Sequence, residues 1–307
     1  MAILTGIQTK LRGSAGSITF RRNSGKTVVS EKVTDVKVSR TVAQLRQRTK
    51  LSNVVAMYRG CIPQLRYAFE KKGNGRSDYN MFVKVNMQQT PVYLTKQMVA
   101  GGACVAAPYQ ITQGTLPAIV ITGEGNTAVT DIFLGGETLS ASTTVAAFSK
   151  AVVENNPDYR YGDQISYFIV RQLVNEATKT PYCQFASHKV VLDAANDEKL
   201  WSVVPKNGFF SQDGCIGKYG NDGDCVFAWV HSRKAYNGRI LVSSQSLIDA
   251  NSKLADYTSD LAYNLAASSY GTSKDVFLAP DGNVNGNDSG IANTGGGGGS
   301  QGGGDSL

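Results

Sequence analysis

The chain has 307 residues, of which 41% are hydrophobic and 18% are charged, so it can fill about two domains and build a true core. Its 33 Gly, 14 Tyr and 11 Phe against only 8 Pro favour many short strands and turns over long helical bundles. No apolar stretch reaches the roughly 18 residues of a membrane span, and neither end has the apolar run of a signal peptide. We therefore expect a soluble globular protein made in a reducing cytoplasm, with no membrane partner.

Positive charge is concentrated at one end of the chain. Residues 1–50 contain 11 Lys and Arg against 2 acids, a net charge of +9. Because the whole chain is +7, the other 257 residues together carry −2. This asymmetry predicts a basic arm that meets nucleic acid or an acidic neighbour in an assembly.

The N-terminal region carries the signals of an arm followed by a β-hairpin. Residues 1–16 are small, polar and basic around three glycines, and they are predicted to lack structure until they dock on a partner. Residues 17–22 and 27–30, joined by the turn sequence NSGK, are predicted to form the hairpin. Two such short strands are marginal alone, so we expect them to complete their sheet on another element or subunit.

Helical periodicity begins at Thr41, and apolar residues recur on one face as far as Phe69. Gly60 followed by Pro63 is predicted to divide this region into two helices. A further short helix is expected over residues 78–87, with Ser77 as its N-cap.

We place a domain boundary near residue 90, so that residues 1–90 form the arm, the hairpin and the helical region. Residues 91–280 are predicted to form a β-rich body, in which residues 164–172 are apolar on both faces, as in a central strand. Helices are expected over residues 142–155 and 256–270. The other strands are predicted at residues 92–95, 104–109, 117–122, 129–134, 182–192, 225–231 and 239–244.

Two further signals complete the predicted fold. Asn237 and Gly238 form the strongest turn signal in the chain and predict that the last two strands are a hairpin. Residues 281–307 are too rich in glycine to bury surface and are predicted to be a flexible tail. The expected fold class is therefore α+β, with a basic N-terminal arm and β-hairpin, a short helical region, a mainly antiparallel β-sandwich-like body and a disordered Gly-rich C-terminal tail.

The five cysteines stand singly, and most lie in apolar runs. We interpret them as reduced core residues, because free cysteine is among the most buried residue types. A disulfide between Cys215 and Cys225 is the alternative. The remaining three are Cys61, Cys104 and Cys183.

Catalytic and metal-binding motifs are almost absent. The HExxH, paired CxxC, GxxxxGKS/T and GxGxxG patterns do not occur in their usual frames. His188 and His231 lie in expected strands and are interpreted as surface or hydrogen-bonded structural residues. Asn221, Asp222 and Asp224 offer oxygen ligands for calcium, but an ordinary turn is preferred because no bidentate Glu follows at the required distance. We expect no enzymatic activity, no cofactor and no metal site.

Two other groups of side chains have structural interpretations. Four isolated acids near expected turns are interpreted as turn caps. Four tyrosines beside turns can form a shallow aromatic surface, although packing in the core or at its rim is preferred. The acids are Asp158, Asp163, Asp193 and Asp197, and the tyrosines are Tyr109, Tyr159, Tyr161 and Tyr219.

Basic residues of the N-terminal region make up the candidate set for binding a partner or nucleic acid. Those on the expected helix fall largely outside its apolar stripe, as is typical of a solvated face or of a surface for phosphates or an acidic neighbour. The set is Lys10, Arg12, Arg21, Arg22, Lys26, Arg40, Arg46, Arg48, Lys50 and Arg59.

Two blocks of the sequence stand out as motifs. One is RTVAQLRQRTK at residues 40–50, which follows a Gly-rich hairpin. The other is residues 225–247, with SRK at 232–234 and RILVSSQSL at 239–247. Together they resemble a family of proteins from Bacteroidetes and their crAss-like tailed phages. The resemblance covers about the first ninety residues and the last strand pair. It implies a structural protein of the virion and supplies no catalytic residue.

We therefore expect a repeated subunit of a phage capsid, head-tail connector or tail, located in the virion after synthesis in the host bacterial cytoplasm. Its expected partners are copies of itself, in a homo-oligomer such as a ring, and other virion proteins. One alternative is a protein that binds nucleic acid without reading sequence, through the basic N-terminal region. A second is a glycan- or host-binding β domain on a virion appendage.

Overall fold

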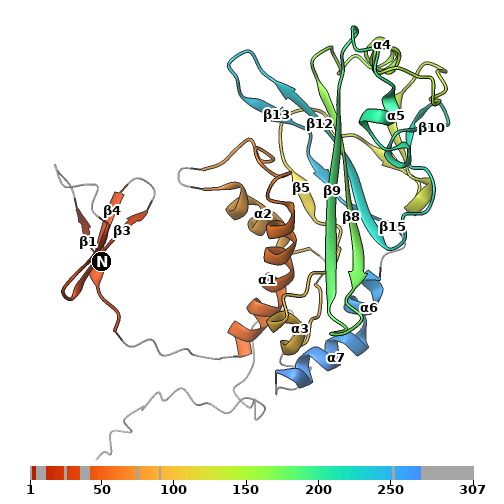
Figure 1. Cartoon of the computed structure of the whole chain (residues 1–307). Coiled ribbons are helices and arrows are strands. Elements are labelled where there is room, and N and C mark those ends of the chain that lie inside the picture. Colours follow the sequence, from red (N-terminus) through yellow and green to blue (C-terminus); the bar gives the residue numbers. More distant parts are fainter. Residues whose placement is uncertain are drawn as a thin grey trace, which may run out of the picture. The chain divides into compact units, whose positions relative to one another are not determined.

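Figure 1 shows the computed structural model of the chain, which describes residues 2–4, 12–23, 26–34, 42–73, 76–89, 91–250 and 253–270. The protein is α+β with mostly antiparallel sheets, as predicted. Contacts divide it into two units, Met1–Arg48 with Asn264–Leu307, and Thr49–Tyr263, which we call the body. The predicted tail lies outside the described residues.

The N-terminal sheet has four antiparallel strands in the order β1-β4-β3-β2. The predicted hairpin is confirmed as β3 (Ile18–Asn23) and β4 (Lys26–Glu31). Its sheet is completed by β1 (Ala2–Leu4) and β2 (Gly13–Ala15), so the expectation that residues 1–16 lack structure was wrong for these two segments. The third strand that the hairpin needs comes from the same chain.

A glycine turn explains why β2 folds back on β3. Gly13 and Gly16 have φ angles of +114° and +58°, which residues with a side chain rarely adopt. Residues 13–15 therefore pair with residues 18–20 across a tight connection. These two glycines suggested disorder in the sequence, but in the structure they form the turn.

Helix α1 (Val42–Cys61) runs through Gly60 and ends at Cys61, and no helix follows directly. The predicted division into two helices was therefore wrong. A Cβ at Gly60 would overlap the ring of Phe185, so the glycine allows close packing of the helix on the sheet rather than breaking it. The apolar pattern beyond it reflects Leu65 and Phe69, which are 1% exposed in an irregular segment.

Helix α2 (Asp78–Asn86) confirms the next predicted helix, and the Ser77 hydroxyl accepts a hydrogen bond from the Asn80 amide at its start. Short helix α3 (Lys96–Ala100) was not predicted. The predicted closing helix is divided into α6 (Leu254–Thr258) and α7 (Asp260–Ser269).

The predicted strands at residues 92–95 and 104–109 do not form. The second segment is buried, and side chains bond to the backbone in its middle, while its ends bond to the backbone of Pro181 and Leu247. Asn53 exchanges two hydrogen bonds with Val105, of 2.8 and 3.0 Å, and the Gln172 carbonyl oxygen accepts from the Ala106 amide at 2.7 Å. An apolar run can thus be buried in extended form without joining a sheet.

A five-stranded antiparallel sheet forms the centre of the body. Its order is β13 (Ile240–Val242), β12 (Cys225–Lys234), β8 (Gln164–Val174) and β9 (Pro181–Val191), and β15 (Ile248–Ala250) also pairs with β12. The central position predicted for residues 164–172 is confirmed, because β8 lies between β9 and β12. The predicted hairpin around Gly238, whose φ is +77°, is also confirmed as β12 and β13.

The two faces of this sheet build two cores. Val226, Ala228 and Val230 pack with α1 and α2 on one side. Phe227 and Trp229 pack on the other, in a second core. Alternation along β12 therefore explains why its first seven residues are all buried.

Helix α4 (Val145–Asn155), where a helix was predicted, and a second sheet cover the side of Trp229. That sheet has the order β10 (Phe210–Gln212), β11 (Cys215–Gly217), β7 (Val129–Phe133) and β6 (Ile121–Thr122). Ile132, Ile216 and Trp229 belong to one core, so the body is β-sandwich-like here. The short helix α5 (Leu200–Val203) and a strand pair, β5 (Gln110–Thr112) with β14 (Gln245–Ser246), complete it.

The boundary that we placed near residue 90 lies inside the body. Phe82, before it, and Leu94, after it, belong to the same core and are completely buried. Of the helices that the structure describes, none combines the length and apolar character needed to cross a bilayer.

Candidate functional site

The predicted basic residues are distributed over both units. Arg12, Arg21 and Lys26 are exposed on or beside the N-terminal sheet. Lys10 and Arg40 lie outside the described residues. Of the other predicted residues, Arg22 lies in β3. The remaining four lie in α1: Arg46, the exposed Arg48, the partly buried Lys50 and the exposed Arg59.

The N-terminal sheet presents two different faces. Phe20 pairs with Val29, and alternation places Ile18 on the same face. Ile18 is 42% exposed, and the described residues of this sheet form no hydrophobic core of their own. Arg21 and Lys26 lie on the opposite face, and no ion pair joins either of them to a described carboxylate.

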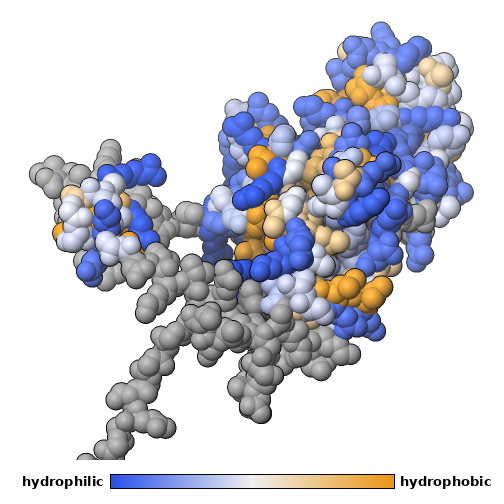
Figure 2. Space-filling model, turned by 60° about the horizontal axis from the view of Figure 1, so that its bottom comes forward, coloured by the Kyte–Doolittle hydropathy of each residue, from blue (hydrophilic) through white to orange (hydrophobic). Residues whose placement is uncertain are grey.

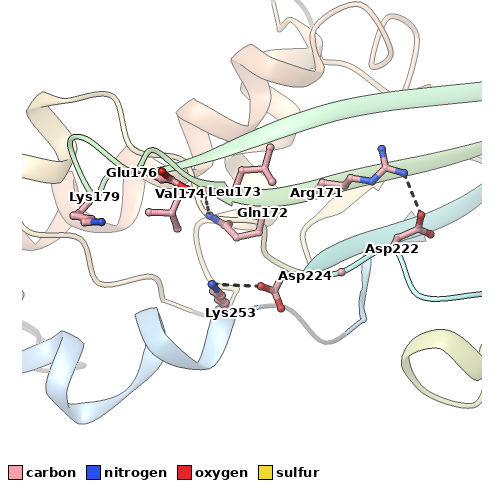
Figure 3. Close-up of a pocket in the computed structure, with 10 residues that line it drawn as sticks. Arg171, Gln172, Leu173, Val174, Glu176, Lys179, Asp222, Asp224 and Lys253 are labelled. Carbon is pink, nitrogen blue, oxygen red and sulfur yellow. Dashed lines mark hydrogen bonds and ion pairs between the residues drawn. The ribbon is translucent and has the colours of Figure 1, made fainter.

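The body contains a cavity of about 460 Å³ at the end of β8, where three loops meet (Figure 3). Strand β8 supplies Arg171, and the loop before β12 supplies Asp222 and Asp224. Lys179 comes from the turn between β8 and β9, and Lys253 precedes α6. The lining contains charged residues of both signs.

The carboxylate of Asp222 bonds to three other side chains at this site. It accepts hydrogen bonds from the ammonium of Lys218 at 2.6 Å, from the amide of Asn207 at 2.7 Å and from the guanidinium of Arg171 at 3.1 Å. Burial opposes its ionisation, but these donors outweigh burial and hold the pKa of Asp222 below its ordinary value. Lys218 is completely buried, so its charge depends on this carboxylate.

The side chains of the 221–224 turn have partners within the chain. The oxygens of Asp222 are occupied by side-chain donors, and the Asn221 side chain accepts from the Gly223 amide at 2.8 Å. Asp224 lies 3.8 Å from the ammonium of Lys253. Within the described residues, no group of His, Cys, Asp or Glu is arranged to hold a metal ion. The geometry is that of a charged turn, and it offers calcium no free set of oxygens.

Asp163 anchors a second buried cluster, at the start of β8. The guanidinium of Arg233 donates two hydrogen bonds to the Asp163 carboxylate, one to each oxygen, at 2.6 and 2.5 Å. The Nε2 atom of His231 lies 2.9 Å from the Oδ2 atom of the same carboxylate. Asp163 and His231 are each 1% exposed, and Tyr159 stacks on the imidazole with ring centroids 4.3 Å apart. Asp163 also accepts from the Arg160 amide, so it caps a turn as expected and in addition neutralises a buried cation.

Burial lowers the pKa of His231, although the hydrogen bond to Asp163 acts in the opposite direction. Burial opposes the ionisation of Asp163 too, but hydrogen bonds from Arg233 and His231 outweigh it and lower its pKa. The cluster is therefore a carboxylate with a neutral imidazole and a guanidinium at neutral pH. His188 is half-buried on β9, and burial together with the charge of Arg171 lowers its pKa.

The four tyrosines do not form one surface. Tyr109 is 2% exposed in the first core, and Tyr159 is stacked on His231. Tyr161 and Tyr219 remain 47% and 44% exposed. In the view of Figure 2 the surface is largely hydrophilic, with apolar residues in small groups.

A different aromatic group surrounds the ammonium of Lys206. Its distances to the ring centroids of Tyr219, Trp201 and Phe210 are 4.1, 5.2 and 5.5 Å. Its members come from α5, β10 and the loop after β11, so no local sequence pattern reveals them. The chain's own lysine therefore occupies this cation–π site.

All five cysteines are unpaired, so the alternative of a disulfide between Cys215 and Cys225 was wrong. Burial raises the pKa of Cys225 to about 11 and also raises that of Cys61. Such thiols are protonated at neutral pH and are poor nucleophiles.

Comparisons with protein-family models, with curated proteins and with solved structures find no match to this chain.

Proposed function

We propose that this chain is a non-enzymatic structural subunit of a phage virion, repeated in the capsid, the head-tail connector or the tail and held by contacts of its N-terminal region. The observation that carries the proposal is the N-terminal sheet, in which Ile18, Phe20 and Val29 share one face while the described residues form no hydrophobic core of their own. The motif resemblance of residues 40–50 and 225–247 supports the virion context.

The apolar face of that sheet is suited to a neighbouring subunit. Ile18, Phe20 and Val29 lie together on it, and Ile18 is 42% exposed. A single sheet layer buries the apolar side chains of one face only when another element or subunit packs on that face. In a repeated assembly, the neighbour supplies that surface.

The proposal is tested by mass spectrometry of purified particles from cells infected with a phage that encodes this chain. We expect the chain in virions at a copy number typical of a repeated subunit. Phe20→Asp should lower incorporation at least about tenfold, because a charge placed in an apolar contact costs more than 1.4 kcal/mol. Thr19→Asp, on the opposite face of the same strand, is the control and should incorporate normally. A chain that is absent from particles contradicts the proposal.

Binding of nucleic acid is the second candidate, supported by the opposite face of the sheet. Arg21 and Lys26 are exposed there without an acidic partner among the described residues. If they contact phosphates, affinity for DNA falls steeply with salt, and each change to Ala lowers the slope of log K against log salt by about one. Lys234→Ala, in the body, serves as the control. An undetectable or salt-independent interaction rejects this candidate.

A further inference from the structure

Strand β9 is a long edge of the central sheet with one side unpaired. It has 11 residues and pairs with β8 alone among the described strands (Figure 1). Its register with β8 is continuous from Val191 opposite Gln164 to Pro181 opposite Val174, with no bulge. Soluble proteins usually shorten, charge or bulge such an edge, because its free backbone groups accept another strand.

Hydrogen bonds at the two ends of β9 show which of its backbone groups face outward. The Asn175 amide donates to the Thr180 carbonyl at 3.0 Å, and the Leu192 amide donates to the Asp163 carbonyl at 2.8 Å. Antiparallel pairs alternate between bonded and non-bonded, so even-numbered residues of β9 bond to β8. The odd-numbered residues direct their N–H and C=O groups away from the sheet.

In the described part of the chain, the outward groups from Cys183 onward have no hydrogen-bond partner. The Pro181 carbonyl accepts from the Cys104 amide at 3.0 Å. No described hydrogen bond involves the outward backbone groups of Cys183, Phe185, Ser187, Lys189 and Val191. The side chains of the last three are exposed.

The charges of the strand favour pairing with itself. Lys189 is the one permanently charged residue of β9, and His188 is neutral at neutral pH because its pKa is lowered. In an antiparallel pair centred on Ser187, Lys189 lies opposite Phe185 of the second copy, and Val191 lies opposite Cys183. No like charges meet, and the aliphatic stem of Lys189 can pack on the Phe185 ring of the second copy.

We propose that residues 183–191 of β9 pair with the same residues of a second copy, antiparallel and centred on Ser187, so that the two central sheets become continuous across a two-fold axis. The contact is isologous, because each copy gives and receives the same strand. It uses a different surface from the N-terminal sheet, so it can fail while the proposed virion role stands.

The test is analytical ultracentrifugation of the full chain at concentrations up to about 100 µM, where even weak specific contacts are populated. We expect the wild-type protein to dimerise. Ser187→Lys and Ser187→Asp each place like charges opposite one another on the two-fold axis and should weaken dimerisation at least about tenfold. An equimolar mixture of the two variants should restore the dimer, because opposite charges then meet.

Gln184→Lys is the matched control. It adds the same charge to the same strand at an exposed position, but in the proposed register it lies opposite Val190 and should leave dimerisation near the wild-type level. Thermal melting checks that each variant is folded. A monomeric wild type, an unaffected Ser187→Lys variant, or a mixture that stays monomeric overturns the proposal.

Discussion

The central sheet of the body and the N-terminal sheet are both antiparallel, but they differ in how their faces are buried. The central sheet of the body has a hydrophobic core on each face, and Phe227 and Val226 point into opposite cores. Within its own unit, the described part of the N-terminal sheet forms no such core, and Ile18 is 42% exposed. The stability of the body is therefore internal, whereas that of the sheet depends on what covers its apolar face.

The largest effect is expected from the buried charges of the body. Asp163→Asn removes the carboxylate that neutralises Arg233 and leaves that cation partly buried without a counter-charge. Breaking such a pair costs about 3–5 kcal/mol of unfolding free energy. Chemical denaturation measures the loss, and Asp197→Asn, at an exposed position, should change stability by less than about 0.5 kcal/mol.

The same cluster predicts sensitivity to acid. Because burial lowers the pKa of His231 below its ordinary 6.5, the unfolded chain binds a proton at a pH where the folded chain does not. Stability therefore falls as the pH drops below about 6.5, and it falls further near the lowered pKa of Asp163. Stability that rises between pH 6.5 and 5 would contradict this account of the cluster.

Close packing of α1 on β9 gives the next effect. Ala normally stabilises a helix relative to Gly by up to about 1 kcal/mol. At Gly60 the added methyl group meets the Phe185 ring, so Gly60→Ala should instead destabilise the body by about 1–3 kcal/mol. Thermal melting gives the sign of the stability change. A loss of stability shows that Gly60 is needed for packing, and a gain shows that it only weakens the helix.

A double variant sharpens this prediction. Phe185→Ala alone removes a partly buried ring and destabilises the body, but in its presence Gly60→Ala should become neutral or stabilising. Independent, additive effects would show that the two residues are not in contact.

The smallest effect is expected from the N-terminal sheet. Val29→Ala should change the melting temperature of the body by no more than the equivalent of about 0.5 kcal/mol, because this residue lies outside both cores. In the isolated subunit, the amides of β3 and β4 should exchange with solvent much faster than those of β8. If the amides of β3 and β4 in the isolated chain exchange as slowly as those of β8, the N-terminal sheet is as stable as the body and the comparison is wrong.

Residue patterns predicted the three long strands of the central sheet. Strands β8, β9 and β12 were found because their apolar runs have strand length and turn signals at their ends. The same rule failed at residues 104–109, where Asn53 and Gln172 replace a neighbouring strand. A local pattern reports burial, but it does not report which groups satisfy the buried backbone.

Charge predicted a basic N-terminal region, but the buried charged clusters of the body were missed. Asp163 meets Arg233 across 70 positions, and Arg171 meets Asp222 across 51. One signal was present, since His231 and Arg233 are two residues apart on one strand and therefore share a face. Their acidic partner is set by the pairing of β8 with β12, which no local pattern contains.

The sequence by itself determined the α+β class, the concentration of positive charge before residue 50 and four of the five strands of the central sheet, because charge and short-range periodicity are local properties. Only the tertiary structure decided that the first strands complete the hairpin, that Gly60 packs on Phe185, and that β9 is an edge with outward-facing backbone groups. Each of these depends on contacts between residues distant in the chain, and such contacts exist only once the strand order is fixed.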